Sequence, residues 1–406
     1  MIYCDCNRRK TSYFAIRCCE LGIFVQKKMI QRSLLKELQK RIVGHKALIV
    51  LGPRQVGKTT LLRELMSEKD VLFLNGDDPT VQSLLANVNT EALRQLIGKH
   101  AFVFIDEAQR IDNIGITLKL ITDQIQTCQL IVSGSSAFEL RNATNEPLTG
   151  RKWEYQLFPI SWTEFEAYVG FLKAEQLLET RLIYGFYPEV ITQFGEEREI
   201  LIQLSESYLY KDLYAVGAKL KRPELLPKIL QALAYQVGNE VSHNEIAQLI
   251  GADNQTVTNY IDLLIKSYVI FPLHSFSRNL RNEIKAKKKY YFYDNGIRNA
   301  VISNFSPVSM RNDIGALWEN FLVSEKKKYN QYQMLHANTY FWRTTGQQEI
   351  DYLEEMDGHL KAYEFKWNPN AKWRVPKTFL NAYQAQVFKI DRSNFRSFLT
   401  PTDANI

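Results

Sequence analysis

One short segment in the first third of the chain has the residue types of a phosphate-binding site. Between Gly52 and Thr60 the sequence reads GPRQVGKTT. The glycines let the backbone curl so that successive amide groups point inward around phosphate oxygens. Lys58 would contact the phosphates, and the Thr59 hydroxyl would be a ligand of Mg²⁺. The segment therefore predicts an ATP-binding P-loop made of Gly52, Pro53, Arg54, Gln55, Val56, Gly57, Lys58, Thr59 and Thr60.

An acidic pair follows a buried strand that we predict at Ala101–Ile105. Asp106 would hold the Mg²⁺, and Glu107 would orient the attacking water. This pair predicts that ATP is hydrolysed as well as bound. The alternatives are a chance glycine-rich turn at 52–60 and a solvated strand end at Asp106. The presence of both motifs in one chain argues against each alternative.

Two further residues are candidates for contact with the γ-phosphate. Ser135 follows a predicted buried strand and would sense this phosphate, with a plain turn as the alternative. Arg151 precedes another predicted strand and would stabilise transition-state charge, in its own chain or in a neighbouring one. A solvated surface arginine is its alternative. Action on a neighbour would require a homo-oligomer.

A hairpin near the C-terminus collects acidic residues on one face. The pair Asp357-Gly358 is a two-residue turn signal. In the register that this turn imposes, Asp351 lies opposite Glu364. Directly opposed carboxylates repel each other unless a cation lies between them. A divalent metal is therefore the predicted occupant, and a solvated face neutralised by lysine is the alternative.

The hydrophobic pattern predicts the elements that must position these residues. Short apolar strands alternate with helical stretches in the N-terminal part of the chain. This is the pattern of a mostly parallel sheet that is covered by helices on both faces. Ligands bind at the carboxyl ends of such strands, where the P-loop and Asp106 lie. The predicted strands are 47–51, 71–75, 101–105, 130–134 and 153–158.

Three helical patterns in the middle of the chain predict a helix-turn-helix with a basic wing. The third helix would read DNA, and Ser242 and Asn254 would cap the last two helices. Packing or protein interaction is the alternative role. The helices are predicted at 225–237, 242–250 and 254–267, with an apolar seam of Ile246, Leu249, Val257, Ile261 and Leu264, a polar face of Asn254, Gln255, Thr256, Thr258 and Asn259, and basic wing residues Arg278, Arg281, Lys285, Lys287, Lys288 and Lys289.

The overall composition limits the class of protein. Hydrophobic residues make up 45% and charged residues 23% of the chain, as in soluble globular proteins. The net charge of +7 permits contact with nucleic acid without requiring it. No apolar run reaches the roughly 20 residues of a membrane span, so we expect a cytoplasmic protein. Four of the five cysteines lie in the first 19 residues, in a leader that we expect outside the fold, with zinc binding as the alternative.

The chain resembles the prokaryotic AAA-like ATPases of the archaeal type, whose C-terminal half is a domain of unknown function with restriction-endonuclease-like character. The resemblance rests on motifs that run in order through the chain: GPRQVGKTT, FIDEAQ, SGSS, TGR, FPISWTEF, YGFYPEV, YLYKDL, YFYDNGIRNA, and EID with EFK. It implies a helical lid around YGFYPEV. It also assigns Asp351 and Glu364 to a Mg²⁺ site of a nuclease-like core, with Lys366 as its lysine and Glu319 as a possible further ligand.

The predicted fold is α/β: a three-layer P-loop domain, then a helical region, a winged helix-turn-helix and a small restriction-endonuclease-like domain. The predicted function is ATP hydrolysis coupled to action on DNA. Two other functions stay open, an ATP-gated switch that binds a protein partner and a metal-dependent nuclease that ATP regulates. The predicted boundaries are 1–28 for the leader, 29–165 for the ATPase domain, 166–220 for the lid, 221–295 for the winged helix, 296–395 for the nuclease-like domain and 396–406 for the tail.

Overall fold

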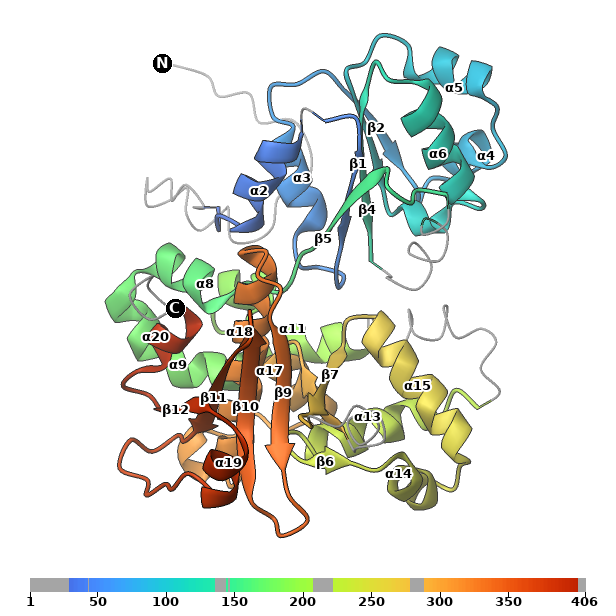
Figure 1. The fold of residues 1–406 in the computed structure, drawn as a ribbon. Helices are drawn as coiled ribbons and strands as arrows, with labels where there is room; N and C mark the ends of the chain where they lie inside the picture. Colours follow the sequence, from blue (N-terminus) through green and yellow to red (C-terminus); the bar gives the residue numbers. More distant parts are fainter. Residues whose placement is uncertain are drawn as a thin grey trace, which may run out of the picture.

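The computed structural model describes residues 29–42, 44–135, 144, 147–206, 222–277 and 288–400. Figure 1 shows two lobes, with the N-terminal sheet in one and the rest of the chain in the other. The cysteine-containing leader, the YLYKDL segment and most of the basic wing lie outside the described residues. Within the described ranges, no helix has both the length and the apolar character to cross a membrane.

The N-terminal lobe is built on a five-stranded parallel sheet with the strand order β2-β3-β4-β1-β5. The apolar runs in the centre of the sheet are buried on both faces, as a helix-covered parallel sheet requires. Figure 1 shows α2 and α3 on one side and α4, α5 and α6 on the other. This confirms the prediction of a parallel, doubly covered sheet. The bounds are α2 Leu34–Arg41, β1 Ala47–Leu51, α3 Lys58–Leu65, β2 Val71–Asn75, α4 Pro79–Leu85, α5 Thr90–Ile97, β3 Phe102–Asp106, α6 Ile114–Gln124, β4 Gln129–Gly134 and β5 Lys152–Gln156.

A helical region connects the two lobes. It begins with a capping box, in which Ser161 and Glu164 bond to each other's backbone amide. Within the lid segment YGFYPEV, a helix ends at Tyr184 and a new one begins at Pro188, because Gly185 adopts a positive φ of 68° that favours glycine. The bounds are α8 Trp162–Val169, α9 Phe171–Tyr184, α10 Pro188–Thr192 and α11 Glu197–Gln203.

The second lobe contains one mixed sheet of seven strands, ordered β12-β11-β10-β9-β7-β8-β6. The wing strands β7 and β8 pair antiparallel, and β7 also pairs in parallel with β9 of the C-terminal part. The region predicted to be a winged helix and the C-terminal part therefore share one sheet, which continues across the boundary predicted at residue 295. The strand bounds are β6 Glu240–Val241, β7 Ile270–Ser275, β8 Lys288–Phe292, β9 Asn338–Arg343, β10 Glu349–Met356, β11 His359–Phe365 and β12 Ala385–Ile390.

Helices cover this sheet. The three helices predicted at 225–237, 242–250 and 254–267 are present as α13, α14 and α15, with small differences at their ends. Asp253, not Asn254, caps the third helix of the helix-turn-helix, since its carboxylate accepts from the Thr256 amide at 2.7 Å. Leu249 does not join the apolar seam: it is 74% exposed, on the outer face of its helix. The bounds are α13 Leu225–Tyr235, α14 His243–Ile250, α15 Asn254–Lys266, α17 Asn295–Val301, α18 Ile314–Tyr332, α19 Lys377–Ala382 and α20 Phe395–Leu399.

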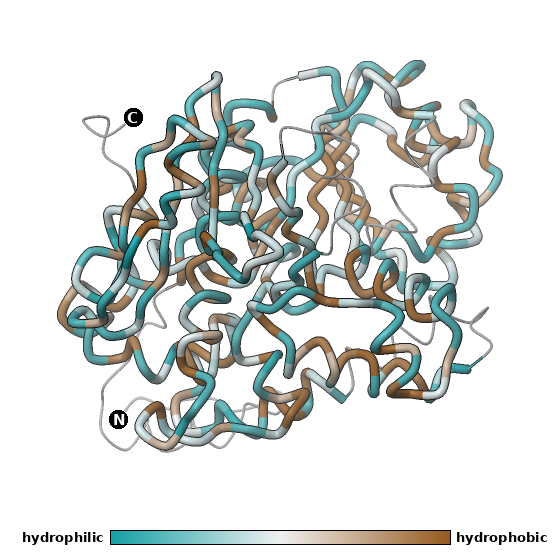
Figure 2. The backbone as a smooth tube through the Cα atoms, turned by 60° about the horizontal axis from the view of Figure 1, so that its bottom comes forward, coloured by the Kyte–Doolittle hydropathy of each residue, from teal (hydrophilic) through white to brown (hydrophobic). Residues whose placement is uncertain are grey.

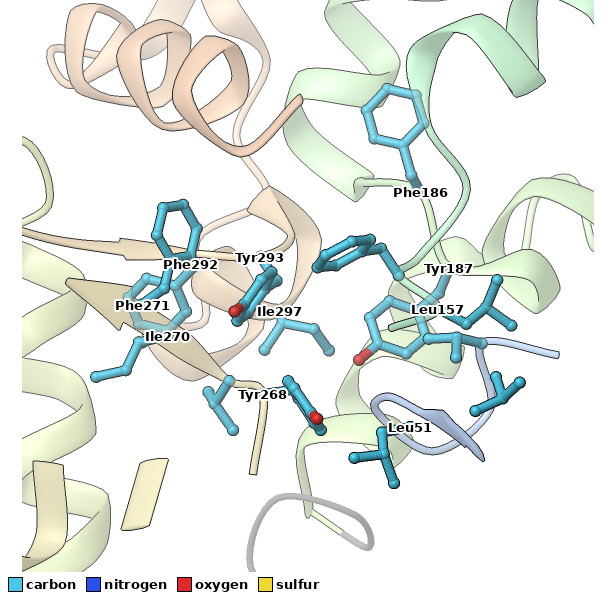
Figure 3. Close-up of a cluster of buried hydrophobic side chains, with 14 of the residues drawn as sticks. Leu51, Leu157, Phe186, Tyr187, Tyr268, Ile270, Phe271, Phe292, Tyr293 and Ile297 are labelled. Carbon is cyan, nitrogen blue, oxygen red and sulfur yellow. The ribbon is translucent and has the colours of Figure 1, made fainter. Parts of the chain in front are cut away.

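Hydrophobic residues are packed continuously from one lobe to the other. Figure 2 shows the hydrophobic segments running through the inside of the molecule. At the junction, Leu51 and Leu157 of the N-terminal lobe lie near Tyr187, Tyr268 and Tyr293 of the second (Figure 3). The end of the central strand β1, next to the P-loop, is thus supported by side chains of the second lobe.

Candidate functional site

The P-loop leaves the buried strand β1 and enters α3, as predicted. Gly52 has φ of 153°, and a Cβ atom there would lie 2.1 Å from the carbonyl oxygen of Leu157. Only glycine fits this close approach. The same contact explains why β5 ends at Gln156 rather than at the predicted Phe158: Leu157 leaves the strand to pack under the loop, while its amide still donates to Leu51 at 2.7 Å.

Two predicted Mg²⁺ ligands are in direct contact. The Thr59 hydroxyl donates to Oδ2 of Asp106 at 2.8 Å, although the two residues belong to different elements, α3 and β3. A hydroxyl and a carboxylate are the oxygen ligands that Mg²⁺ prefers, so these residues fit the ion. Lys58 is buried, and its Nζ donates to the carbonyl oxygens of Gly52 and Pro53 at 3.0 and 2.8 Å.

The Glu107 carboxylate lies beside this pair and is held in place by polar neighbours. Its Oε2 accepts from Gln109 at 2.5 Å and from the Ser135 hydroxyl at 3.1 Å. Burial alone would raise the pKa of Glu107, but the charge of Lys58 and the bonds from Gln109 and Ser135 lower it below its ordinary value. Glu107 is therefore ionised at neutral pH. The Ser135 hydroxyl lies within hydrogen-bond distance of its carboxylate.

Sequence reasoning missed two polar side chains of this site. Ser133 contacts Asp106 through its hydroxyl and accepts from the Glu107 amide at 3.2 Å. Gln109 also donates to Ser135, at 2.9 Å. The signal for both was available, since they lie inside the SGSS and FIDEAQ segments. Ser133, inside β4, contacts the predicted Mg²⁺ ligand Asp106, whereas Ser135, just after the end of this strand, contacts Glu107 instead.

The structure does not bring Arg151 to the phosphate-binding end of its own sheet. Its carbonyl oxygen accepts from the amide of Ala47, the first residue of β1, whereas the P-loop follows Leu51. These ends of β1 are about 13 Å apart at the usual rise of a strand. The guanidinium of Arg151 pairs instead with Asp123 at the end of α6. A role within its own chain is thus at odds with this geometry, and a role on a neighbouring chain stays a prediction.

Arg32 is a buried arginine that the sequence analysis did not single out, and it contacts the backbone of the P-loop. Arg32 donates to the carbonyl oxygens of Val56 and Phe158, both at 2.6 Å, and pairs with Glu164 at 3.2 Å. The Tyr332 hydroxyl, at the end of α18 in the second lobe, accepts from the same guanidinium at 3.4 Å and from the Phe158 amide at 3.1 Å. One guanidinium therefore joins the P-loop, the FPIS segment and the second lobe.

The predicted hairpin near the C-terminus has the predicted register. Tyr352 pairs with Tyr363 and Met356 pairs with His359. Ile350 and Tyr352, which alternate with Asp351 along the strand, are buried on the opposite face of the hairpin. Burial and the charges of Glu319 and Glu364 raise the pKa of Asp351 well above its ordinary value. The carboxylates predicted to gather here are therefore close enough to repel one another.

The cations of this acidic cluster are lysine and arginine side chains. Lys289 of β8 is fully buried and reaches Glu319 at 3.0 Å and Glu349 at 2.5 Å. Lys366 pairs with Glu364 at 2.7 Å. Among the residues that the structure describes, no three His, Cys, Asp or Glu side chains form a group suited to a metal ion. The donor types match a metal site, but the arrangement does not.

The predicted DNA-reading helix presents its polar face to solvent. Asn254, Gln255 and Asn259 of α15 are exposed. Of the six basic wing residues, Lys288 and Lys289 lie within the described ranges, and Lys289 is turned inward to the acidic cluster. Lys289 is therefore not available to a phosphate backbone, contrary to the prediction.

Three known family models match consecutive segments of the chain. Residues 44–166 match a model described as an AAA domain. Residues 175–308 and 314–399 match two models described as domains of unknown function, DUF8612 and DUF4143. The chain thus carries an AAA P-loop ATPase domain that is followed by two domains whose role is unknown. The AAA domain implies nucleotide binding.

The curated relatives that match most of the chain are described as uncharacterized proteins. An uncharacterized protein of Mycobacterium tuberculosis is 25% identical over 332 residues, which cover 79% of this chain and 71% of the relative. One of Methanocaldococcus jannaschii is 22% identical over 357 residues, 75% of this chain and 74% of the relative. One of Haemophilus influenzae is 23% identical and covers 63% of this chain and 68% of the relative.

Solved structures overlap with the chain only in part. AMPPCP-bound DnaA from Aquifex aeolicus is 18% identical, with a TM-score of 0.27, and covers 57% of this chain and 86% of that one. A signal transduction ATPase with numerous domains from Pyrococcus horikoshii is 12% identical, with a TM-score of 0.29, and covers 77% of this chain and 48% of that one. At these TM-scores the likeness carries no functional argument.

Proposed function

We propose that this chain hydrolyses ATP with Mg²⁺ and uses the nucleotide cycle to act on DNA. The observation that carries the proposal is the 2.8 Å contact between the Thr59 hydroxyl and Asp106, which unites the predicted ligands from two separate elements. A chance glycine-rich turn would not require the second strand to end in a carboxylate at this place.

The residues of the site have distinct roles in the proposed reaction. Lys58 would exchange its bonds to the loop carbonyl oxygens for bonds to the β- and γ-phosphates. Thr59 and Asp106 would hold Mg²⁺, which neutralises charge on the phosphate oxygens. Glu107 would accept a hydrogen bond from the attacking water, with Ser135 and Gln109 fixing the position of its carboxylate.

The contacts between the lobes support coupling to the winged helix. Arg32 bonds to Val56 in the P-loop and to Tyr332 on α18, while Asn320 of α18 accepts from the amide of Phe292 on β8 at 2.7 Å. A change in the P-loop on nucleotide binding would therefore act on a helix that spans the second lobe. The exposed amides of Asn254, Gln255 and Asn259 are suited to base edges or phosphates, so DNA is the proposed partner.

The decisive experiment measures ATP turnover of the purified chain without nucleic acid and with double-stranded, single-stranded and branched DNA. We expect turnover that Lys58→Ala abolishes and that DNA stimulates. Stimulation should fall in a variant with Asn254, Gln255 and Asn259 changed to alanine, whereas basal turnover should not. Turnover that survives Lys58→Ala would refute the ATPase proposal. Turnover that no DNA changes would favour the ATP-gated switch with a protein partner.

A further inference from the structure

The acidic cluster of the second lobe contains an internal cation from another part of the fold. Lys289 lies on β8 of the winged helix, whereas its partners Glu319 and Glu349 lie on α18 and β10. The side chain of Lys289 is fully buried, and its amine also lies 5.3 Å from the Phe341 ring. A lysine is rarely buried so completely unless carboxylates pair with it.

The Glu319 carboxylate is occupied by the winged helix on both sides. Its Oε1 accepts from Lys289 at 3.0 Å and from the Tyr291 hydroxyl at 2.6 Å. Its Oε2 lies 3.1 Å from the position that a Cβ atom would take at Gly238, in the turn before β6. Oε1 of the predicted third metal ligand is therefore already bonded to two residues of the winged helix, and Oε2 lies close to the backbone of Gly238.

The other carboxylates of the cluster have their own partners. Glu349 also pairs with Arg343 at 3.5 Å, and Glu364 pairs with Lys366 at 2.7 Å. One oxygen of Asp351 accepts from the Phe365 amide at 2.7 Å. Mg²⁺ requires near-octahedral oxygen ligation, and the buried ammonium group of Lys289 lies against two of the carboxylates, Glu319 and Glu349, that would have to supply it. The residues present therefore do not fit the divalent metal that the sequence predicts here.

We infer that this cluster is a salt-bridged joint between the winged helix and the C-terminal part, with Lys289 as its cation in place of a divalent metal. The lysine neutralises carboxylates that would otherwise repel one another, and it ties β8 to α18 and β10. A joint of this kind holds the wing strands in the same sheet as β10 without any cofactor. It also accounts for the inward turn of one basic residue in a segment that otherwise resembles a DNA-binding wing.

The test compares Mn²⁺ binding to the full chain and to Asp351→Asn by calorimetry, in the absence of nucleotide. Any ion bound weakly at Thr59 and Asp106 is common to both proteins and cancels in the comparison. We expect identical Mn²⁺ isotherms and no Mn²⁺-dependent plasmid cleavage that Asp351→Asn removes. A Mn²⁺ site in the wild-type chain that is lost in Asp351→Asn or in Glu364→Gln would overturn the inference.

Thermal unfolding distinguishes the roles of the two lysines. We expect Lys289→Met to lower Tm by several degrees, on the scale of about 2 to 4 °C per kcal/mol for a large domain. The double variant Lys289→Met with Glu319→Gln should recover part of this loss, because it removes one uncompensated charge. Lys366→Met is the matched control at a half-exposed pair and should change Tm little. A larger loss in Lys366→Met than in Lys289→Met would contradict the inference, and the Mn²⁺ comparison decides the case if Lys289→Met does not fold.

Discussion

The guanidinium of Arg32 donates a 2.6 Å hydrogen bond to the carbonyl oxygen of Val56, in the middle of the phosphate-binding loop. Both residues are buried. Glycine-containing loops cradle phosphate only when their amide groups point inward, so a fixed carbonyl on the outer side of the loop supports that orientation. Arg32 is therefore expected to act by positioning the loop through its contacts with the backbone.

The first prediction concerns this contact. Arg32→Lys keeps the charge beside Glu164 but cannot reach both carbonyl oxygens, so we expect KM for ATP to rise about tenfold, the equivalent of one lost hydrogen bond. Steady-state kinetics checks this. Arg181→Lys is the matched control, because Arg181 is equally buried and pairs with Glu197 away from the P-loop. It should lower Tm without raising KM. Equal KM changes in both variants would mean that Arg32 acts only on stability.

The second prediction separates hydrolysis from binding. Glu107→Gln keeps the hydrogen bonds to Gln109 and Ser135 but loses the charge that orients water. We expect kcat to fall by about 10² to 10⁴ with ATP affinity retained, the range of a positioned general base. Lys58→Ala should instead lose the affinity, as fluorescent-nucleotide titration would show. Unchanged turnover in Glu107→Gln would show that Glu107 does not take part in hydrolysis.

The third prediction follows from the position of Arg151 at the opposite end of the sheet from the P-loop. If it acts on a neighbouring chain, Arg151→Ala and Glu107→Gln will each be inactive alone, and their mixture will recover part of the turnover. Recovery requires sites that combine an intact Glu107 with an intact Arg151 from the other chain. Asp123→Ala is the control for the loss of the ion pair alone. Full activity of Arg151→Ala alone would show that Arg151 is a surface residue with no role in ATP turnover.

The fourth prediction concerns the acid stability of the second lobe. Asp313 accepts from Arg311 at 2.8 Å and from Arg298 at 2.6 Å. Burial raises the pKa of Asp313, but these bonds and charges outweigh burial and lower it below 3.8. A lowered pKa means that the carboxylate stabilises the fold above the unfolded-state pKa and that this contribution disappears as pH falls through the folded-state value.

We therefore expect Asp313→Asn to cost about 1 to 3 kcal/mol of unfolding free energy at pH 7, and less as the pH is lowered below 3.8. Chemical denaturation over this pH range measures the difference between variant and wild type. Asp77→Asn is the control, since Asp77 forms an exposed pair with Arg110 at 3.6 Å. If the difference in unfolding free energy between Asp313→Asn and the wild type grew as the pH fell, the prediction would be wrong.

The sequence by itself determined the local elements of this protein. The strand before the P-loop, the glycines, Lys58 and Thr59 follow from residue type and spacing, because phosphate binding at a helix N-terminus is a local property of the backbone. The hairpin register at Asp357-Gly358 was equally predictable, since a two-residue turn fixes which residues face each other.

Only the tertiary structure decided which distant side chains meet. Arg32 reaches the P-loop from a segment with no motif, and its contact with Tyr332 joins residues far apart in the chain. Lys289 was expected on a solvated wing, yet the shared sheet turns it toward Glu319 and Glu349. The opposed carboxylates predict that a cation lies beside them. Whether this cation is a metal ion or a lysine depends on which strand the sheet places next to the carboxylates, and the local sequence does not determine that.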